Sequence, residues 1–262
     1  MDLGVRDSII NYVREIIKDE LRIDRRKLME YRPIKIIKNF IKNAEGSCYV
    51  EFGNTKVLAG IKFEIGEPFE DKPDEGIFIT NVELSPMAFP TIDPGPSDLS
   101  IEYSRIVDRI IRESRFIDLK KLVIEPGKYV WTTFIDIYVL DDDGNIIDAS
   151  VLAAVCSLLN AKLPKLEKVG DKYKIDPKVK TENIPLNKNI PVMVTFAKID
   201  DKFIVDPNKY EEDAADMIIH IGITDKIHAL QTRRSGKISL EEFMFLTEQA
   251  ERFKNYLLEK IR

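Results

Sequence analysis

The chain has 262 residues, of which 44% are hydrophobic and 32% are charged, and its net charge at pH 7 is −5. This composition is sufficient to bury a large core. No run of about 18 apolar residues predicts a membrane-spanning helix. The acidic balance argues against binding a polyanion through overall charge, which leaves a local basic surface as the alternative. Charged residues interrupt the apolar ones from the start of the chain, so we expect a cytoplasmic protein without a secretory signal.

The first part of the chain is predicted to be a helix followed by strands. Apolar residues recur at helical spacing between 7 and 20, and Asp7 or Ser8 is the expected N-cap. Pro33 ends any helix, because the residue before a proline favours extended backbone. The chain then alternates between apolar and polar residues on both sides of Gly53-Asn54, which predicts a hairpin.

Four longer elements follow the hairpin. We expect a strand (76–89), a helix (99–116), a buried strand (128–140) and a helix of small residues (149–163). Ser97 and Asp98 are suitable N-caps for the first of these helices. The turn between the second strand and the second helix reads Asp-Asp-Asp-Gly-Asn.

The remainder of the chain resembles the first part in its order of elements. Residues 165–189 are rich in Lys, Asp, Asn and Pro, and are predicted to connect two halves. Strands are then expected on both sides of Asp200-Asp201 and over 217–224 and 227–233. Ser239 and Glu242 match a capping box that opens the last helix. The apolar face of that helix consists of Phe243, Leu246, Ala250, Phe253, Leu257 and Ile261.

Each half thus reads as strands followed by helices, which predicts an α+β fold built by duplication. The expected organisation is an N-terminal helix and arm (1–33), a first half (34–164), a connection (165–189) and a second half with the C-terminal helix (190–262).

The helix predicted over 99–116 carries three arginines on one face and apolar residues on the other. At about 100° per residue, Arg105, Arg109 and Arg112 share a face. One interpretation is a solvated face on which nearby acidic residues pair with these arginines. The other is a site for an anionic polymer, because guanidinium groups suit phosphate oxygens and stack on bases.

Familiar catalytic and metal-binding motifs are missing. The chain has no Gly-rich phosphate loop, nucleophile elbow or His-Glu-x-x-His pair. Cys48 and Cys156 lie far apart, so we expect two buried, reduced thiols. His220 and His228 are expected to be packed residues. Two acidic segments (141–143 and 211–216) suit either solvated turns or a divalent ion, and we predict neither a metal nor a cofactor.

Several segments together resemble the RNase PH family, and within it the non-catalytic ring subunits of archaeal exosomes. They are RIDRRKLMEYRPI (22–34), GSCYVEFGNTKVLAGI (46–61), IGEPFEDKPDEG (65–76), VELSPMAF (82–89), SRIVDRIIRES (104–114) and DASVLAAVCSLL (148–159). Arg25 stands where the family's opening segment usually has glycine. The resemblance covers about residues 20–258 and implies an RNase PH-like fold of two similar halves.

The resemblance also implies partners. Such subunits form a hexameric ring of three heterodimers with a catalytic RNase PH-like sibling, and cap subunits with S1 and KH domains cover one face. The ring degrades single-stranded RNA from its 3′ end with phosphate. A subunit of this kind would structure the sibling's active site and guide RNA.

The chain departs from active family members in one turn. Those members carry Gly-Gly followed by Thr-Arg or Ser-Arg, which holds the attacking phosphate, whereas this chain has Gly144-Asn145-Ile146-Ile147. Two isoleucines can neither donate hydrogen bonds to a phosphate nor neutralise it. Active members also have two aspartates six residues apart, and Asp216 matches at most one of them. We therefore expect no catalytic residue, a degenerate phosphate site and a vestigial Asp216.

The arginine helix acquires a role from this comparison. Arg105, Arg109 and Arg112 are the main candidates for RNA binding, with Arg112 foremost, and Arg25 and Arg26 are weaker candidates. Arg109 is equally suited to a subunit interface. Two other functions stay open: an independent phosphate-dependent 3′–5′ exoribonuclease that uses Asp216, and an RNA- or protein-binding scaffold without a catalytic sibling.

Overall fold

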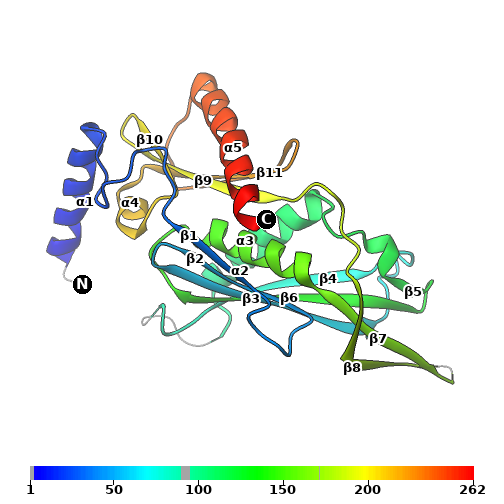
Figure 1. Ribbon diagram of the computed structural model, residues 1–262. Helices are drawn as coiled ribbons and strands as arrows, with labels where there is room; N and C mark the ends of the chain where they lie inside the picture. Colours follow the sequence, from blue (N-terminus) through cyan, green and yellow to red (C-terminus); the bar gives the residue numbers. More distant parts are fainter. Residues whose placement is uncertain (1–2, 90–94, 171) are drawn as a thin grey trace.

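The computed structural model describes residues 3–89, 95–170 and 172–262 (Figure 1). Its helices are α1 (Leu3–Lys18), α2 (Asp98–Glu113), α3 (Ile146–Asn160), α4 (Lys209–Ala214) and α5 (Leu240–Ile261), with a 3-10 turn η1 (Leu119–Leu122). Its strands are β1 (Ile34–Lys38), β2 (Gly46–Phe52), β3 (Thr55–Gly66), β4 (Ile77–Leu84), β5 (Val123–Glu125), β6 (Tyr129–Asp141), β7 (Lys162–Val169), β8 (Lys172–Asn183), β9 (Val192–Ile199), β10 (Lys202–Val205), β11 (Met217–Ile223) and β12 (Ile227–Arg233). No helix in these ranges is long and apolar enough to cross a membrane.

The first sheet has the order β1-β2-β3-β6-β4, with β5 paired to β6. Its neighbours are antiparallel except for β4, which runs parallel to β6 and forms an edge. The predicted hairpin is confirmed, since Phe52 pairs with Thr55 across Gly53-Asn54. Gly53 has a φ of +56°, a left-handed conformation that glycine adopts without steric cost.

The second sheet has the order β10-β9-β11-β12 and is antiparallel throughout. The predicted turn at Asp200-Asp201 is confirmed by the pairing of Ile199 with Lys202. Buried strands β9 and β11 lie in the middle of this sheet, and β12 forms one edge.

Helix α3 lies between the two sheets (Figure 1). It packs on β2 and β3 from one side and on β9 from the other, and 13 of its 15 residues are buried. Alanines and serines let both sheets approach this helix closely. Cys48 of β2 and Cys156 of α3 are free, buried thiols, as predicted. The α+β fold of two halves is confirmed, and α3 gives both halves one core.

Helices α2 and α5 follow their sequence patterns. Ser97 caps α2 as predicted, although the helix ends at Glu113 rather than Phe116. Its buried side includes Tyr103, Ile106, Val107, Ile110 and Ile111. The capping box of Ser239 and Glu242 is confirmed at the start of α5. On the apolar face of α5 the five later residues are buried, whereas Phe243 is half-buried.

One prediction about elements was wrong, and two elements were not predicted. Helix α1 begins at Leu3, so Asp7 and Ser8 lie inside it rather than at its N-cap; acidic and hydroxyl residues suit the first turns of a helix as well as its cap. The segment predicted to connect the two halves (165–189) contains most of a hairpin formed by β7 and β8, which the sequence pattern did not reveal. Its many lysines obscured the alternation of Tyr173 and Ile175. The short helix α4 in the acidic segment was also not foreseen.

The close contact of β2 with α3 leads to a stability prediction. A Cβ atom on Gly46 would lie 2.7 Å from Ala161 Cα and still closer to the Ser157 carbonyl oxygen. We expect Gly46→Ala to lower the free energy of unfolding by about 1–3 kcal/mol. Gly60, on β3, has nothing within 4 Å of its Cβ direction, so Gly60→Ala is the matched control and should not destabilise. Equal denaturation midpoints for the two variants would contradict this packing.

Candidate nucleic-acid interface

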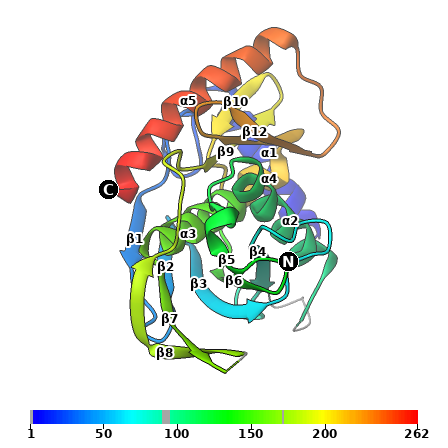
Figure 2. The ribbon, with the colours of Figure 1, turned by 90° about the vertical axis from the view of Figure 1, so that its right-hand side faces the viewer.

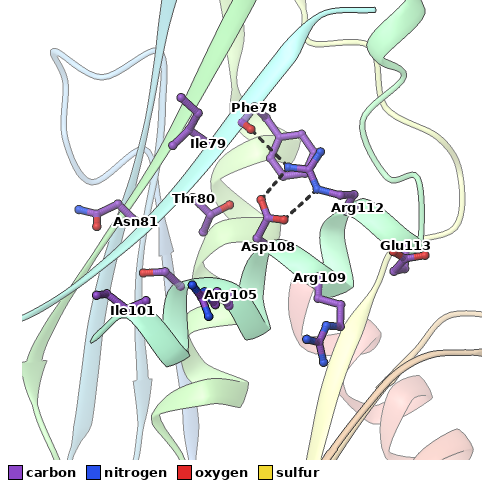
Figure 3. A pocket seen from close by; sticks show the side chains of 11 residues that line it. Phe78, Ile79, Thr80, Asn81, Ile101, Arg105, Asp108, Arg109, Arg112 and Glu113 are labelled. Carbon is purple, nitrogen blue, oxygen red and sulfur yellow. Dashed lines mark hydrogen bonds and ion pairs between the residues drawn. The ribbon is translucent and has the colours of Figure 1, made fainter. Parts of the chain in front are cut away.

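The solvent face of α2 and the free edge of β4 enclose a hollow of about 610 Å³ (Figure 3). It is lined by Phe78, Ile79, Thr80, Asn81, Ile101, Ser104, Arg105, Asp108, Arg109, Arg112 and Glu113. Arg105, Arg109 and Arg112 are all exposed, so their predicted position on one outward face is confirmed. We refer to this hollow as the α2–β4 groove.

Arg112 is already held by the protein. Its Nε and Nη2 atoms donate to both carboxylate oxygens of Asp108 at 2.8 and 2.9 Å. Its guanidinium carbon lies 4.1 Å from the centre of the Phe78 ring, and Nη2 lies 3.5 Å from the Phe78 carbonyl oxygen. Its charge is therefore partly neutralised, and an anion would have to compete with Asp108.

Arg105 and Arg109 are less constrained. Arg109 donates to Gln231 of β12 at 3.2 Å. Arg105 makes no hydrogen bond or ion pair with any residue in the described ranges. A second hollow of about 480 Å³ adjoins Arg105 and Arg109 toward Gln231. Arg105 thus lies between two hollows, and no described residue pairs with its guanidinium group.

β4 is an edge strand, so the backbone groups on its free side have no neighbouring strand to pair with. The floor of the groove is therefore polar. Ser104 accepts from the Val82 amide at 2.8 Å, and Arg112 reaches the Phe78 carbonyl oxygen. Between them, the Thr80 hydroxyl is buried without a partner among the described residues. The groove therefore combines available cationic charge with hydrogen-bonding groups, which suits an extended anionic ligand.

In the turn expected to be a degenerate phosphate site, other residues of the protein occupy the hydrogen-bonding groups. Gly144 and Asn145 have left-handed backbone with φ of +81° and +55°. The Asn145 amide donates to Glu212 at 2.8 Å, and its side chain donates to Asp206 at 2.7 Å. Ile146 and Ile147 lie in the first turn of α3, not in a loop, and are buried in the core. Neither isoleucine points toward solvent.

A buried ion-pair cluster, which sequence reasoning missed, holds this turn. Arg32 donates to Asp206 at 2.8 Å and to the carbonyl oxygens of Asp143 and Gly144 at 2.6 and 3.1 Å. Burial alone would raise the pKa of the Asp206 carboxyl, but the guanidinium groups of Arg32 and Arg26 outweigh it and lower that pKa. The signal for this cluster was the arginine-rich segment 22–34, in which the side chains of Arg22, Arg26 and Arg32 are buried.

Arg25 and Arg26 differ sharply in their surroundings. The Arg26 side chain is 8% exposed and donates to Asp24, to Asp206 and to the Glu30 carbonyl oxygen. Because its donors are used within the protein, Arg26 is not available to bind RNA without leaving these partners. Arg25 is exposed and has a φ of +65°, consistent with the glycine that family members have there.

Asp216 is tied to the N-terminal helix. It accepts from Arg14 at 2.6 Å and from the Asp200 amide at 2.7 Å. Burial would raise its pKa, but the hydrogen bond from Arg14 and the amide lowers it overall. The described residues contain no group of three His, Cys, Asp or Glu side chains that could hold a metal ion.

Asp148 begins a buried hydrogen-bonded chain beneath the turn. Its Oδ2 accepts from the Tyr31 hydroxyl, the Asn145 side chain and the Thr195 amide. Its Oδ1 lies 2.5 Å from the Thr195 hydroxyl, which lies 2.8 Å from Nδ1 of His220. Burial raises the pKa of Asp148 to about 7 and lowers that of His220 to about 3. His220 is therefore a packed, neutral residue, as predicted.

Comparison with known proteins agrees with this architecture. Residues 30–164 match domain 1 of the 3′ exoribonuclease family (RNase PH), and residues 189–252 match its domain 2. The chain belongs to the RNase PH family. The family and the RNase PH-like fold expected from the sequence are thus confirmed.

Similar RNase PH family members come from archaea. The exosome complex component Rrp42 of Thermococcus gammatolerans is 45% identical, over 98% of this chain and 95% of its own length. That of Pyrococcus abyssi is 45% identical over 98% and 94%. Among solved structures, a chain of the Archaeoglobus fulgidus exosome with RNA bound to the active site has a TM-score of 0.88 and 38% identity, covering 98% and 99%. A chain of an archaeal exosome core has a TM-score of 0.82 and 35% identity, covering 97% of each.

The Asp148 chain predicts how stability depends on pH. Burial raises the pKa of this carboxyl from 3.8 to about 7, so the folded state holds a proton that the unfolded state releases between these values. Its contribution to stability is complete below about pH 4 and is lost as the pH rises toward 7. In Asp148→Asn the side-chain oxygen can replace Oδ2, which accepts from Tyr31 and the Thr195 amide, and the NH2 group can donate to the Thr195 hydroxyl oxygen. We expect the stability of the variant relative to the parent to increase between about pH 4 and pH 7 in denaturation experiments. Stability curves of the two proteins that run parallel over this range would contradict the assignment.

Proposed function

We propose that this chain is a non-catalytic subunit of an exosome ring, in which it structures the active site of a catalytic RNase PH-like sibling and guides RNA for 3′-to-5′ phosphorolysis. Its similarity to archaeal exosome components over nearly the whole chain supports the exosome assignment. A similar solved chain comes from an exosome with RNA bound. The proposed assembly has three heterodimers in a hexameric ring, with S1- and KH-domain caps, in the cytoplasm.

The turn from Gly144 to Ile147 carries the proposal that the chain does not catalyse. Phosphorolysis needs groups that hold an attacking phosphate and stabilise charge in the transition state. The Asn145 donors are occupied by Glu212, Asp206 and Asp148, and both isoleucines are buried. Asp216 accepts from Arg14 and from the Asp200 amide, so its carboxylate is already paired within the protein. These side chains would have to leave their partners before they could bind phosphate.

The α2–β4 groove is the proposed surface for RNA. Arg105 supplies the most available charge, because it has no partner in the described ranges. Arg109 and Arg112 extend the same face, and Arg25 is a separate exposed candidate. Phosphate contacts of this kind position a strand without reading its sequence. Asp108 limits the contribution of Arg112 until a phosphate replaces it.

The lack of catalysis can be tested directly. The purified chain should release no nucleoside diphosphates from poly(A) with phosphate and Mg²⁺, because it has no phosphate clamp, and addition of the sibling should produce release. In the mixture, Asp216→Asn should leave the rate unchanged. Release by the isolated chain that disappears in Asp216→Asn would instead establish an independent exoribonuclease. No co-purification with a catalytic homologue would favour a scaffold.

The arginine face makes a graded prediction. Arg105→Glu should weaken capture of single-stranded RNA and reduce the slope of log K against log salt by about 1. Arg112→Glu should have a smaller effect, because Asp108 already neutralises Arg112. Asp108→Asn frees Arg112 and should strengthen binding. Fluorescence anisotropy of labelled oligoadenylate without phosphate measures all three, with Arg252→Glu on α5 as the control. Equal losses in Arg105→Glu and Arg252→Glu would contradict the assigned surface.

A further inference from the structure

The β7–β8 hairpin carries a local excess of positive charge. Residues 162–183 include seven lysines against four acidic residues, a net charge of +3 within a chain of net charge −5. The hairpin extends away from the two main sheets in both views (Figures 1 and 2). Charge of this sign is therefore concentrated on a projecting arm of an otherwise acidic protein.

The register of the hairpin directs lysines outward. Tyr173 and Ile175 are half-buried, and the Tyr173 ring lies 5.5 Å from the ring of Tyr129 on β6. Because side chains alternate between the two faces of a strand, Lys172 and Lys174 lie on the opposite, solvent-facing side. Their Cα atoms are about 7 Å apart at the usual rise of a β-strand. This spacing is comparable to that of successive phosphates in an extended single-stranded nucleic acid.

Three lysines of the hairpin have no side-chain partner among the described residues. Lys172, Lys174 and Lys178 are exposed and make no ion pair or hydrogen bond through their side chains within the described ranges. Glu167 lies opposite Lys174 in the register but pairs with Lys165 at 2.8 Å.

Exposed lysines on another part of the first half behave differently. Lys121 pairs with Asp118 at 3.0 Å, and Lys128 pairs with Glu125 at 2.6 Å. A nearby carboxylate thus neutralises both of these lysines. The three lysines of the hairpin therefore present net charge that an external anion would neutralise.

We propose that the β7–β8 hairpin is a second RNA-binding surface, which contacts the backbone of single-stranded RNA outside the α2–β4 groove. This inference rests on the proposed function, because it takes RNA as the polyanion. Lysine is depleted in the cores of protein interfaces, and the large apolar side chains exposed on the described part of the hairpin are Val169 and Val179. A polyanion therefore suits this surface better than a protein partner does. Contacts of lysine with phosphate give binding that is independent of sequence and sensitive to salt.

The test replaces the three unpaired lysines together. Lys172→Gln, Lys174→Gln and Lys178→Gln in one variant should flatten the slope of log K against log salt by about 2, since each phosphate contact on a single strand contributes about 0.7. Binding of labelled oligoadenylate at low salt should weaken by roughly tenfold or more. Anisotropy is measured on the full chain and on the ring reconstituted with the sibling, without phosphate so that no RNA is degraded.

The matched control removes three lysine charges outside the hairpin. Lys188, Lys226 and Lys237 are exposed, and their side chains make no hydrogen bond or ion pair in the described part of the chain. Their triple change to Gln should leave the slope unaltered. Equal slopes for both triple variants, with Arg105→Glu still weakening RNA binding, would overturn the hairpin proposal and leave the proposed function intact. Loss of sibling binding with unchanged RNA affinity would overturn it in favour of a protein interface.

Discussion

The ion pair between Arg32 and Asp206 is the contact on which the rest of the arrangement depends. Arg32 ends the N-terminal arm, Asp206 follows β10 in the second half, and the guanidinium also binds the carbonyl oxygens of Asp143 and Gly144 in the first half. Both charges are buried. Removing such charges from water is costly and is offset only when further hydrogen bonds satisfy the remaining donors and acceptors. Here several hydrogen bonds do so, and three separate segments are held together at one turn.

The Arg32–Asp206 ion pair explains why the backbone of the turn at Asp143 and Gly144 is held in place while no binding site opens there. With the backbone of Asp143 and Gly144 fixed by Arg32, the following residues enter α3 directly, and their apolar side chains meet the core between the sheets. Asn145 completes the same hydrogen-bonded cluster rather than facing solvent. A turn closed in this way is the main support for the proposed non-catalytic role. The exposed cations proposed to bind RNA lie instead on α2 and on the β7–β8 hairpin.

Those two surfaces use different cations for physical reasons. On α2, guanidinium groups lie beside a free strand edge with its own hydrogen-bonding groups, so position and orientation both matter. On the hairpin, ammonium groups lie on an exposed arm. There they act as point charges that attract the phosphate backbone of RNA over a wider range of geometries. Asp108 introduces a further distinction, because it holds Arg112 while Arg105 stays available.

Local patterns in the sequence determined the hairpin at Gly53-Asn54, the capped helices α2 and α5, and the outward face shared by Arg105, Arg109 and Arg112, because each depends on neighbours within a few residues. The family and fold also followed from the segments that resemble RNase PH. Only the tertiary structure decided which charges are available. Arg26 and Arg32 look like surface residues in the sequence, but they bind Asp206, about 180 residues away. Arg105 and Arg112 look equivalent, yet only Arg112 meets both Asp108 and the Phe78 ring. Pairing and burial depend on long-range contacts, which no local pattern encodes.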